Sequence, residues 1–329
     1  MRKFFLLTIA LLSTQFCAFA MLSKEADWEN ERVIQGKPKQ AVLPTINSAK
    51  EKPLTQEKIN QIVCATAVKV FDKINKYWIY PEPKAECEVS SKYWKTTSFY
   101  DQHNHVISPS LILRPEYAIP QLIEALDDLI NNTAVLDCRL AQETVQLFCI
   151  KEILGEDDFR TYLTTYSDMI DKHKARDTYD FFKTFNSNFM ETVHKKEIPG
   201  SIKYIANISE YALCKPHGSA RGLNLFCVGN DQYIGFSEIY ETGPQPLKKR
   251  IQEDFQFFCE STNVEKQADL HSSLCQSFEE EKEKFITLHS KAQNNFYLIF
   301  DVQALKNVKK QVPNFRKEQL KNARNIGSK

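Results

Sequence analysis

The sequence predicts an α+β protein in which helices pack on a small antiparallel sheet. Apolar side chains repeat at helical spacing through residues 55–78 and again through residues 137–154. Glycines gather after Pro199, where six of the nine in the chain fall between residues 200 and 243. Short runs that alternate apolar and polar residues lie between these glycines, and such alternation indicates strands. The main helices therefore precede the sheet along the chain.

The length and composition fit one large folded domain or two modest ones. Of the 329 residues, 42% are hydrophobic and 26% are charged, which excludes a wholly disordered chain. The 43 lysines and arginines are balanced by 42 acidic residues, which excludes a strongly basic nucleic-acid binder. The sequence contains neither GxGxxG nor GxxxxGK(S/T), the glycine-rich loops that cradle phosphates in dinucleotide and P-loop enzymes. We therefore expect no nucleotide cofactor.

The first twenty residues have the layout of a secretory signal peptide. Residues 2–12 place two basic side chains before a short apolar run, and Ala18 and Ala20 supply a small-x-small cleavage site. The run is too short to span a bilayer as a stable helix. We expect residues 1–20 to be removed, the mature chain to begin at Met21, and the protein to be secreted or periplasmic. A buried N-terminal helix is the alternative.

The domain organisation follows from polarity and charge. Residues 21–53 are polar and carry prolines, which indicates an N-terminal arm, and residues 54–302 form the α+β domain. Residues 303–329 form a basic C-terminal tail, and from 306 onward it holds eight basic residues and one acidic residue. Such a tail fits weak contact with an anionic surface. The alternative is a solvated terminal helix or a frayed end that buries little surface.

Local signals place the ends of the elements within the domain. Thr55 is the expected N-cap of the first helix, and Pro81 follows its end. Gly155 is the expected C-cap of the helix that begins near Asp137, and residues 229–231 (Gly-Asn-Asp) indicate a hairpin turn. Residues 84–119 are too irregular to assign. Further helices are expected at 122–130, 156–171, 176–196, 247–258 and 270–278, and strands at 201–205, 223–228, 232–236 and 296–302.

The expected export of the protein bears on the state of its cysteines. Removal of Cys17 leaves eight, and an even number in an oxidising compartment indicates a disulfide framework with at least two bonds. Cys214 and Cys227 are the best candidate pair, because the loop between them is short and contains glycine. Cys138 and Cys149 cannot pair unless the predicted helix breaks between them, since an offset of eleven positions along one helix separates their Cα atoms by about 16 Å.

One cysteine is also a candidate nucleophile. Cys138 falls in the first turn of a predicted helix, where unpaired N–H groups and the helix dipole stabilise a thiolate. Asp137 beside it opposes ionisation. His217, in the glycine-rich region, could act as the base. A buried or disulfide-bonded structural cysteine is the alternative.

Two segments resemble a known family. The first is Leu136-Asp137-Cys138 with the apolar helix that ends at Gly155-Glu-Asp-Asp-Phe159. The second holds, in order, Ile198-Pro199-Gly200, Tyr204-Ile205, Asn207, Gly222-Leu223-Asn224, Gly229 and Tyr233-Ile234-Gly235. Together they resemble the bacterial spore-type protein-glutamine γ-glutamyltransferases (transglutaminases), over roughly residues 120–255.

The resemblance implies a papain/transglutaminase-like core and a cysteine-dependent acyl transferase, deamidase or amidase that acts on glutamine or amide groups of proteins. Cys138 matches the family's nucleophile, but Leu223 stands at the position of its catalytic carboxylate. A leucine cannot accept a proton, so the base role falls to His217, with Asn224 orienting the imidazole. The alternative is a non-enzymatic secreted virulence or interaction protein that keeps the scaffold without the chemistry.

We expect no cofactor and no metal. Asp101, His103 and His105 could offer ligands from alternating strand positions, but further ligands are not apparent and a polar surface segment explains them better. The expected partner is a protein substrate or a host protein, with no nucleic acid, and the expected state is a monomer.

Overall fold

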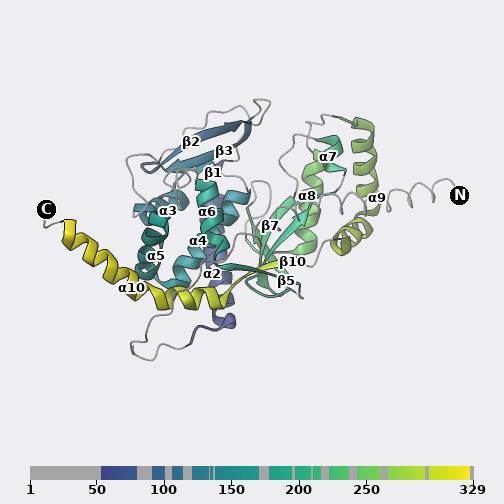
Figure 1. The fold of residues 1–329 in the computed structure, drawn as a ribbon. Helices are drawn as coiled ribbons and strands as arrows, with labels where there is room; N and C mark the ends of the chain where they lie inside the picture. The colour runs from purple at the N-terminus through teal and green to yellow at the C-terminus, as the bar shows by residue number, and fades with distance from the viewer. Residues whose placement is uncertain are drawn as a thin grey trace.

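The computed structural model describes residues 53–79, 91–100, 106–113, 121–132, 134–135, 138–169, 178–194, 197–208, 210–215, 222–236, 243–260, 266–292 and 296–326. These residues place a six-stranded antiparallel sheet between a larger and a smaller group of helices (Figure 1). The predicted combination of helices with a small antiparallel sheet is therefore confirmed at this level.

The larger group, which we call the helical layer, forms where the apolar periodicity predicted helices. Its first helix begins at the expected cap, because the Lys58 N–H donates to Thr55 Oγ1 at 3.2 Å. Gly155, at φ +86°, separates two successive helices, as expected of a C-cap. The layer consists of α2 (Gln56–Tyr77), α3 (Leu122–Asn131), α4 (Cys138–Leu154), α5 (Glu156–Met169) and α6 (Thr178–Ser187).

The six-stranded sheet has the order β5-β10-β6-β7-β8-β9, and each neighbouring pair is antiparallel. Asn230 and Asp231 both have positive φ and join β7 to β8, so the predicted hairpin turn is confirmed. The strands are β5 (Met190–His194), β6 (Ile202–Ala206), β7 (Gly222–Gly229), β8 (Gln232–Gly235), β9 (Gln245–Pro246) and β10 (Phe296–Phe300).

Two smaller pairings complete the strands. β2 (Trp94–Tyr100) and β3 (Val106–Leu113) form an antiparallel hairpin in the stretch that the sequence left unassigned. β1 (Trp78–Ile79) directly follows α2 and pairs in parallel with β4 (Ala134–Val135), which precedes α4.

The helix expected over residues 176–196 is wrong at its C-terminal end. α6 ends at Ser187, and Met190–His194 form the edge strand β5, whose partner is β10. This partner lies about a hundred residues later in the chain. The local pattern could not reveal the pairing, because β5 is mostly exposed and has little apolar alternation.

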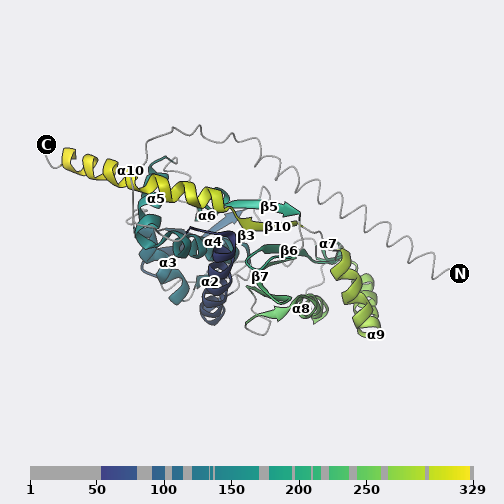
Figure 2. The same ribbon diagram turned by 90° about the horizontal axis from the view of Figure 1, so that it is seen from below.

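Strand β7 separates two apolar clusters, because its side chains alternate between the two faces of the sheet. Phe226 packs in the cluster of the helical layer, whereas Leu223, Leu225 and Cys227 pack in a second cluster on the opposite face. We call this second group the α8–α9 cluster. The helices on this side are α7 (Tyr211–Cys214), α8 (Leu247–Glu260) and α9 (Ala268–Ala292) (Figure 2).

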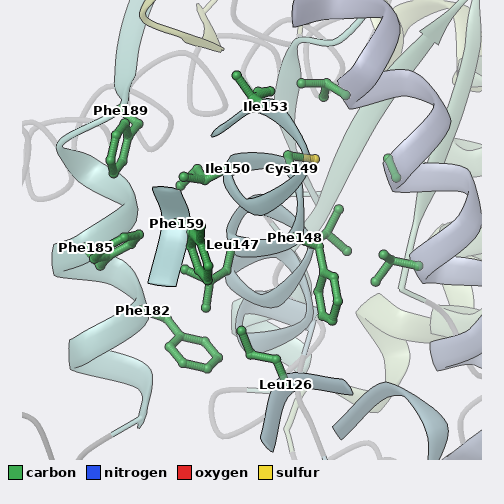
Figure 3. Packing of buried hydrophobic residues seen from close by; sticks show 14 of the residues in the cluster. Leu126, Leu147, Phe148, Cys149, Ile150, Ile153, Phe159, Phe182, Phe185 and Phe189 are labelled. Carbon is green, nitrogen blue, oxygen red and sulfur yellow. The ribbon is translucent and has the colours of Figure 1, made fainter. Parts of the chain in front are cut away.

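Helix α4 is the centre of the helical layer. Every residue from Leu140 to Ile150 is buried. Cys149 lies on the side of α4 that faces α2, while Ile150 lies on the side that faces Phe185 of α6 (Figure 3). A helix that is buried all round must be covered by other elements on every side.

The described disulfide differs from the predicted one. Cys259 at the end of α8 bonds Cys275 of α9, with their Cα atoms 5.5 Å apart. Cys214 and Cys227 are both free, so that predicted pair is wrong. Sequence spacing estimates the entropy of closing a loop, but it does not say which Cβ atoms face each other. Cys87 and the side chain of Cys138 lie outside the described residues, so the expected total of at least two disulfides stays a prediction.

The basic tail is a long helix, α10 (Val302–Ile326). Leu305, Val308 and Val312 are buried, so the expectation that the tail buries little surface is wrong for its first half. Further along, Arg316 pairs with Asp158 of α5 at 2.7 Å. The apolar positions recur at helical spacing among the lysines, and they dock α10 on the helical layer.

We predict that removal of residues 306–329 lowers the free energy of unfolding by about 3 kcal/mol or more, because two buried valines are lost. Removal of residues 321–329 is the matched control, and it should change the stability by less than about 0.5 kcal/mol. Urea denaturation measures both. Equal stability of the 306–329 deletion and the intact chain would contradict the docking of α10.

Candidate functional site

The structure places two of the three predicted site residues. Cys138 is the first residue of α4, although its side chain lies outside the described residues, and Asn224 lies in β7. His217 also lies outside the described residues, in the segment that leads to β7. The contacts that α2 makes with β7 and with α4 show where the start of α4 lies relative to β7.

Helix α2 runs antiparallel to β7. In the third turn of α2, the Cys64 thiol donates to the carbonyl oxygen of Cys227 at 3.6 Å, close to the end of β7. Two turns later, the ring of Phe71 meets the ring of Phe226 edge-on, with centroids 5.7 Å apart. At the start of α2, Gln56 Nε2 donates to the carbonyl oxygen of Phe300, which ends β10 beyond the level of Phe226. The start of α2 therefore lies at the end of β7, and its C-terminal turns lie toward the beginning of β7.

Helix α4 runs antiparallel to α2. β1, which continues from α2, pairs with β4, which leads into α4, through the register Trp78↔Ala134. Burial raises the pKa of Cys149, near the other end of α4, and the thiol of Cys64 in α2 lies close enough to raise it further. The N-terminus of α4 therefore lies beside the C-terminus of α2.

Because α2 runs antiparallel to both β7 and α4, α4 and β7 run in the same direction and begin at the same end of the helical layer. Cys149 lies level with Cys64 and the end of β7, and Cys138 lies eleven residues earlier, or about 16 Å at the rise of a helix. Asn224 lies three residues before Cys227, or about 10 Å along the strand, and Gly222 about 16 Å. Cys138 therefore begins α4 at the end of the layer where Gly222 and Asn224 lie.

Alternation along β7 decides which residue faces α4. Asn224 shares a face with Phe226 and is directed toward the helical layer, and in register it stands opposite Tyr204 of β6. The hydroxyl end of Tyr204 crosses over Gly222, and a β-carbon there would lie 2.5 Å from it and would also collide with the backbone carbonyl oxygen of Ile205, so this position requires glycine. An amide and a phenol therefore share this end of the sheet.

Leu223 faces the opposite way. It is only 8% exposed and belongs to the α8–α9 cluster, with Ile205 opposite it in register. A residue at position 223 is thus directed away from the helical layer. Within the described parts of β6, β7 and β8, the face toward that layer carries no carboxylate and no imidazole. A base for Cys138 would have to come from another segment, and His217 is the candidate from the sequence.

A second polar group, which the sequence did not reveal, lies on the α8–α9 face. The Cys227 thiol donates to Glu197 Oε1 at 3.1 Å, and Tyr233 stands opposite Cys227 in the β7–β8 register. Burial, reinforced by the Glu197 carboxylate, raises the pKa of Cys227 to about 12. Burial and the same carboxylate also raise the pKa of Tyr233. No sequence motif joins Glu197 to a residue thirty positions later, so only the fold shows this group.

The thiol of Cys227 is therefore protonated and unreactive near neutral pH. Burial also raises the pKa values of Cys64, Cys149 and Cys214. None of these four described free cysteines has the environment of a nucleophile, so none of them competes with Cys138 as the candidate that the sequence offers.

The described residues contain no group of three or more His, Cys, Asp or Glu side chains that could hold a metal ion. Asp101, His103 and His105 lie outside them. No helix in the described part of the chain has the length and apolar character needed to cross a membrane. Comparison with family models and with curated proteins finds no match for this chain.

The raised pKa of Cys227 predicts a loss of stability at alkaline pH. Below about pH 8.5 the thiol is protonated in both folded and unfolded chains, so its full contribution is present. As the pH rises toward the folded value of about 12, the unfolded state loses its proton first and folding becomes less favourable. Between pH 8.5 and 10.5 we expect Cys227→Ser, which keeps a donor for Glu197 but does not titrate, to lose about 2 kcal/mol less than the natural chain. Urea midpoints measured across this range test it, and parallel curves would contradict the buried thiol.

Proposed function

We propose that the protein is a cysteine-dependent acyl transferase, deamidase or amidase with a papain/transglutaminase-like core, and that Cys138 is its nucleophile. One observation carries the proposal. The first residue of α4 lies at the end of the helical layer where β7 presents Asn224 toward that layer. Papain-like chemistry depends on a cysteine at a helix N-terminus that meets a histidine, with an Asn or Asp side chain that orients the imidazole. Asn224 is proposed for the orienting role, and His217 is the histidine that the sequence offers.

The N-terminus of α4 would stabilise the negative charges that form in the proposed reaction. Unpaired N–H groups in the first turn of α4 and the positive end of its dipole favour a thiolate over a thiol. The same N–H groups can stabilise the oxyanion of a tetrahedral intermediate. Residues 140–150 of α4 are buried, so most of its dipole lies in surroundings of low polarity, while Arg139 in the first turn is exposed.

The proposed reaction proceeds in two steps. The Cys138 sulfur attacks the side-chain carbonyl of a protein glutamine, His217 takes the thiol proton, and ammonia leaves with that proton to give a thioester. A primary amine or water then attacks the thioester and restores the thiol. Amine attack gives a crosslink, and water gives a deamidated glutamine. Asn224 is proposed as the residue that orients the imidazole.

The proposed partner is a protein substrate, and the proposed location is outside the cytoplasm. Both rest on the sequence, through the resemblance and the signal-peptide pattern of residues 1–20.

A non-enzymatic interaction protein is the second candidate. The observation that favours it is the missing acid or imidazole on the described sheet face toward α4, together with the burial of Leu223 on the opposite face. In this case the scaffold persists and Cys138 is a structural residue.

We predict that Cys138 reacts with iodoacetamide at pH 6–7 at least about tenfold faster than Cys64, a half-buried free thiol of raised pKa.

Cys138→Ala should abolish incorporation of a primary amine into a glutamine-containing protein and release of ammonia from it. His217→Ala should lower kcat by about 100-fold or more. Asn224→Ala should lower kcat and alter its pH profile, because it disturbs the imidazole.

Cys64→Ala is the matched control and should keep full activity. Peptide mapping by mass spectrometry identifies the alkylated cysteine. A Cys138 that is disulfide-bonded, or that reacts no faster than Cys64, would overturn the enzyme proposal and leave the interaction protein.

A further inference from the structure

Helix α10 presents two different sides. Residues of an α-helix are about 100° apart around its axis, so side chains three or four apart share a side. Leu305, Val308, Val312, Phe315 and Gln319 fall within an arc of about 80°. The first three are buried, the ring of Phe315 lies 6.3 Å from that of Tyr162, and Gln319 donates to the carbonyl oxygen of Thr161 at 3.3 Å. This side is the one docked on α5.

The lysines of α10 occupy the side that faces away from α5. They fall within an arc of about 120°, whose centre is about 140° from the centre of the docked side. Over the length they cover, the helix rises about 22 Å. We call this surface the lysine face; it consists of Lys306, Lys309, Lys310, Lys317 and Lys321.

The lysine face is not neutralised by the body of the protein. Within the described residues, none of its five lysines forms an ion pair, whereas Arg316 at the border of the docked side pairs with Asp158. Lys310, Lys317 and Lys321 are exposed. The C-terminal turns of α10 also extend beyond the helical layer in both views (Figure 1, Figure 2). The positive charge of this face is therefore available to a partner.

Leu320 distinguishes between anionic partners. It lies inside the lysine arc, about 20° from one edge, and is 61% exposed, so an apolar side chain projects from the charged face. A phosphate backbone offers nothing apolar to such a side chain, but the acyl boundary of a bilayer does. A basic helix face with an exposed leucine is thus better matched to an anionic bilayer than to nucleic acid.

We propose that the lysine face of α10 binds the surface of anionic phospholipid membranes, with Leu320 entering the headgroup region. The docked side holds the helix against the protein, so the lysines meet the membrane as a prearranged row. This inference is independent of the proposed acyl transfer, because it uses neither Cys138 nor β7.

The test is cosedimentation of the full chain with vesicles of phosphatidylcholine alone or mixed with phosphatidylserine. The chain should bind the mixed vesicles, and binding should weaken as salt rises. Joint substitution Lys310→Glu, Lys317→Glu and Lys321→Glu should weaken binding at least about tenfold, since each basic residue near the surface contributes about 1 kcal/mol. Leu320→Ala should weaken it about threefold.

The matched control carries the same change of net charge on exposed lysines elsewhere in the structure, as Lys69→Glu in α2, Lys248→Glu in α8 and Lys266→Glu just before α9. This control should bind mixed vesicles like the natural chain. Equal weakening by both triple variants would overturn the proposal, because net charge alone would then explain binding. Equal binding to both vesicle types would also overturn it. Tighter binding to a duplex DNA oligonucleotide than to mixed vesicles, unaffected by Leu320→Ala, would assign the face to nucleic acid instead.

Discussion

The burial of α4 is the constraint on which the rest of the structure depends. Eleven successive residues, Leu140 to Ile150, are withdrawn from water, so α4 needs a partner on every side. α2, α5, α6 and β7 supply these partners, and α10 closes the layer over α5. A helix covered in this way cannot shift along the sheet without exposing apolar surface. The level of its N-terminus relative to β7, and hence the candidate site, follows from this packing.

Polar side chains of α4 restrict the positions of the neighbouring helices more closely than apolar packing alone could. Glu143 is buried and accepts a hydrogen bond from Asn186 of α6 at 2.8 Å, and the same amide donates to the Glu143 carbonyl at 2.9 Å. Lys151 reaches Asp127 of α3 at 3.3 Å. A buried carboxylate or ammonium left without its partner is costly, so these contacts restrict where α6 and α3 can lie.

The sequence predicted the helix boundaries that are set by the side chain or the backbone conformation of a single residue. Thr55 caps α2 through its hydroxyl, and Gly155 takes the left-handed conformation that ends α4, so both boundaries were predictable from single residues. β5 could not be predicted, because its strand conformation comes from pairing with β10 and not from its own side chains. The Cys259–Cys275 bond and the Cys227–Glu197 contact likewise depend on tertiary placement. At the candidate site, the sequence predicted roles for Cys138 and Asn224, but only strand alternation shows that Asn224, and not Leu223, faces the helical layer.

The central claim is that Cys138 and Asn224 lie at the same end of the layer between α4 and β7. A short bismaleimide crosslinker tests it in two variants, Asn224→Cys and Val228→Cys, which place a thiol on the same face of β7 about 13 Å apart. Peptide mapping should find Cys138 joined to the new cysteine at 224 and not to the one at 228. A crosslink from Cys138 to position 228, with none to position 224, would reverse the direction of α4 and contradict the account.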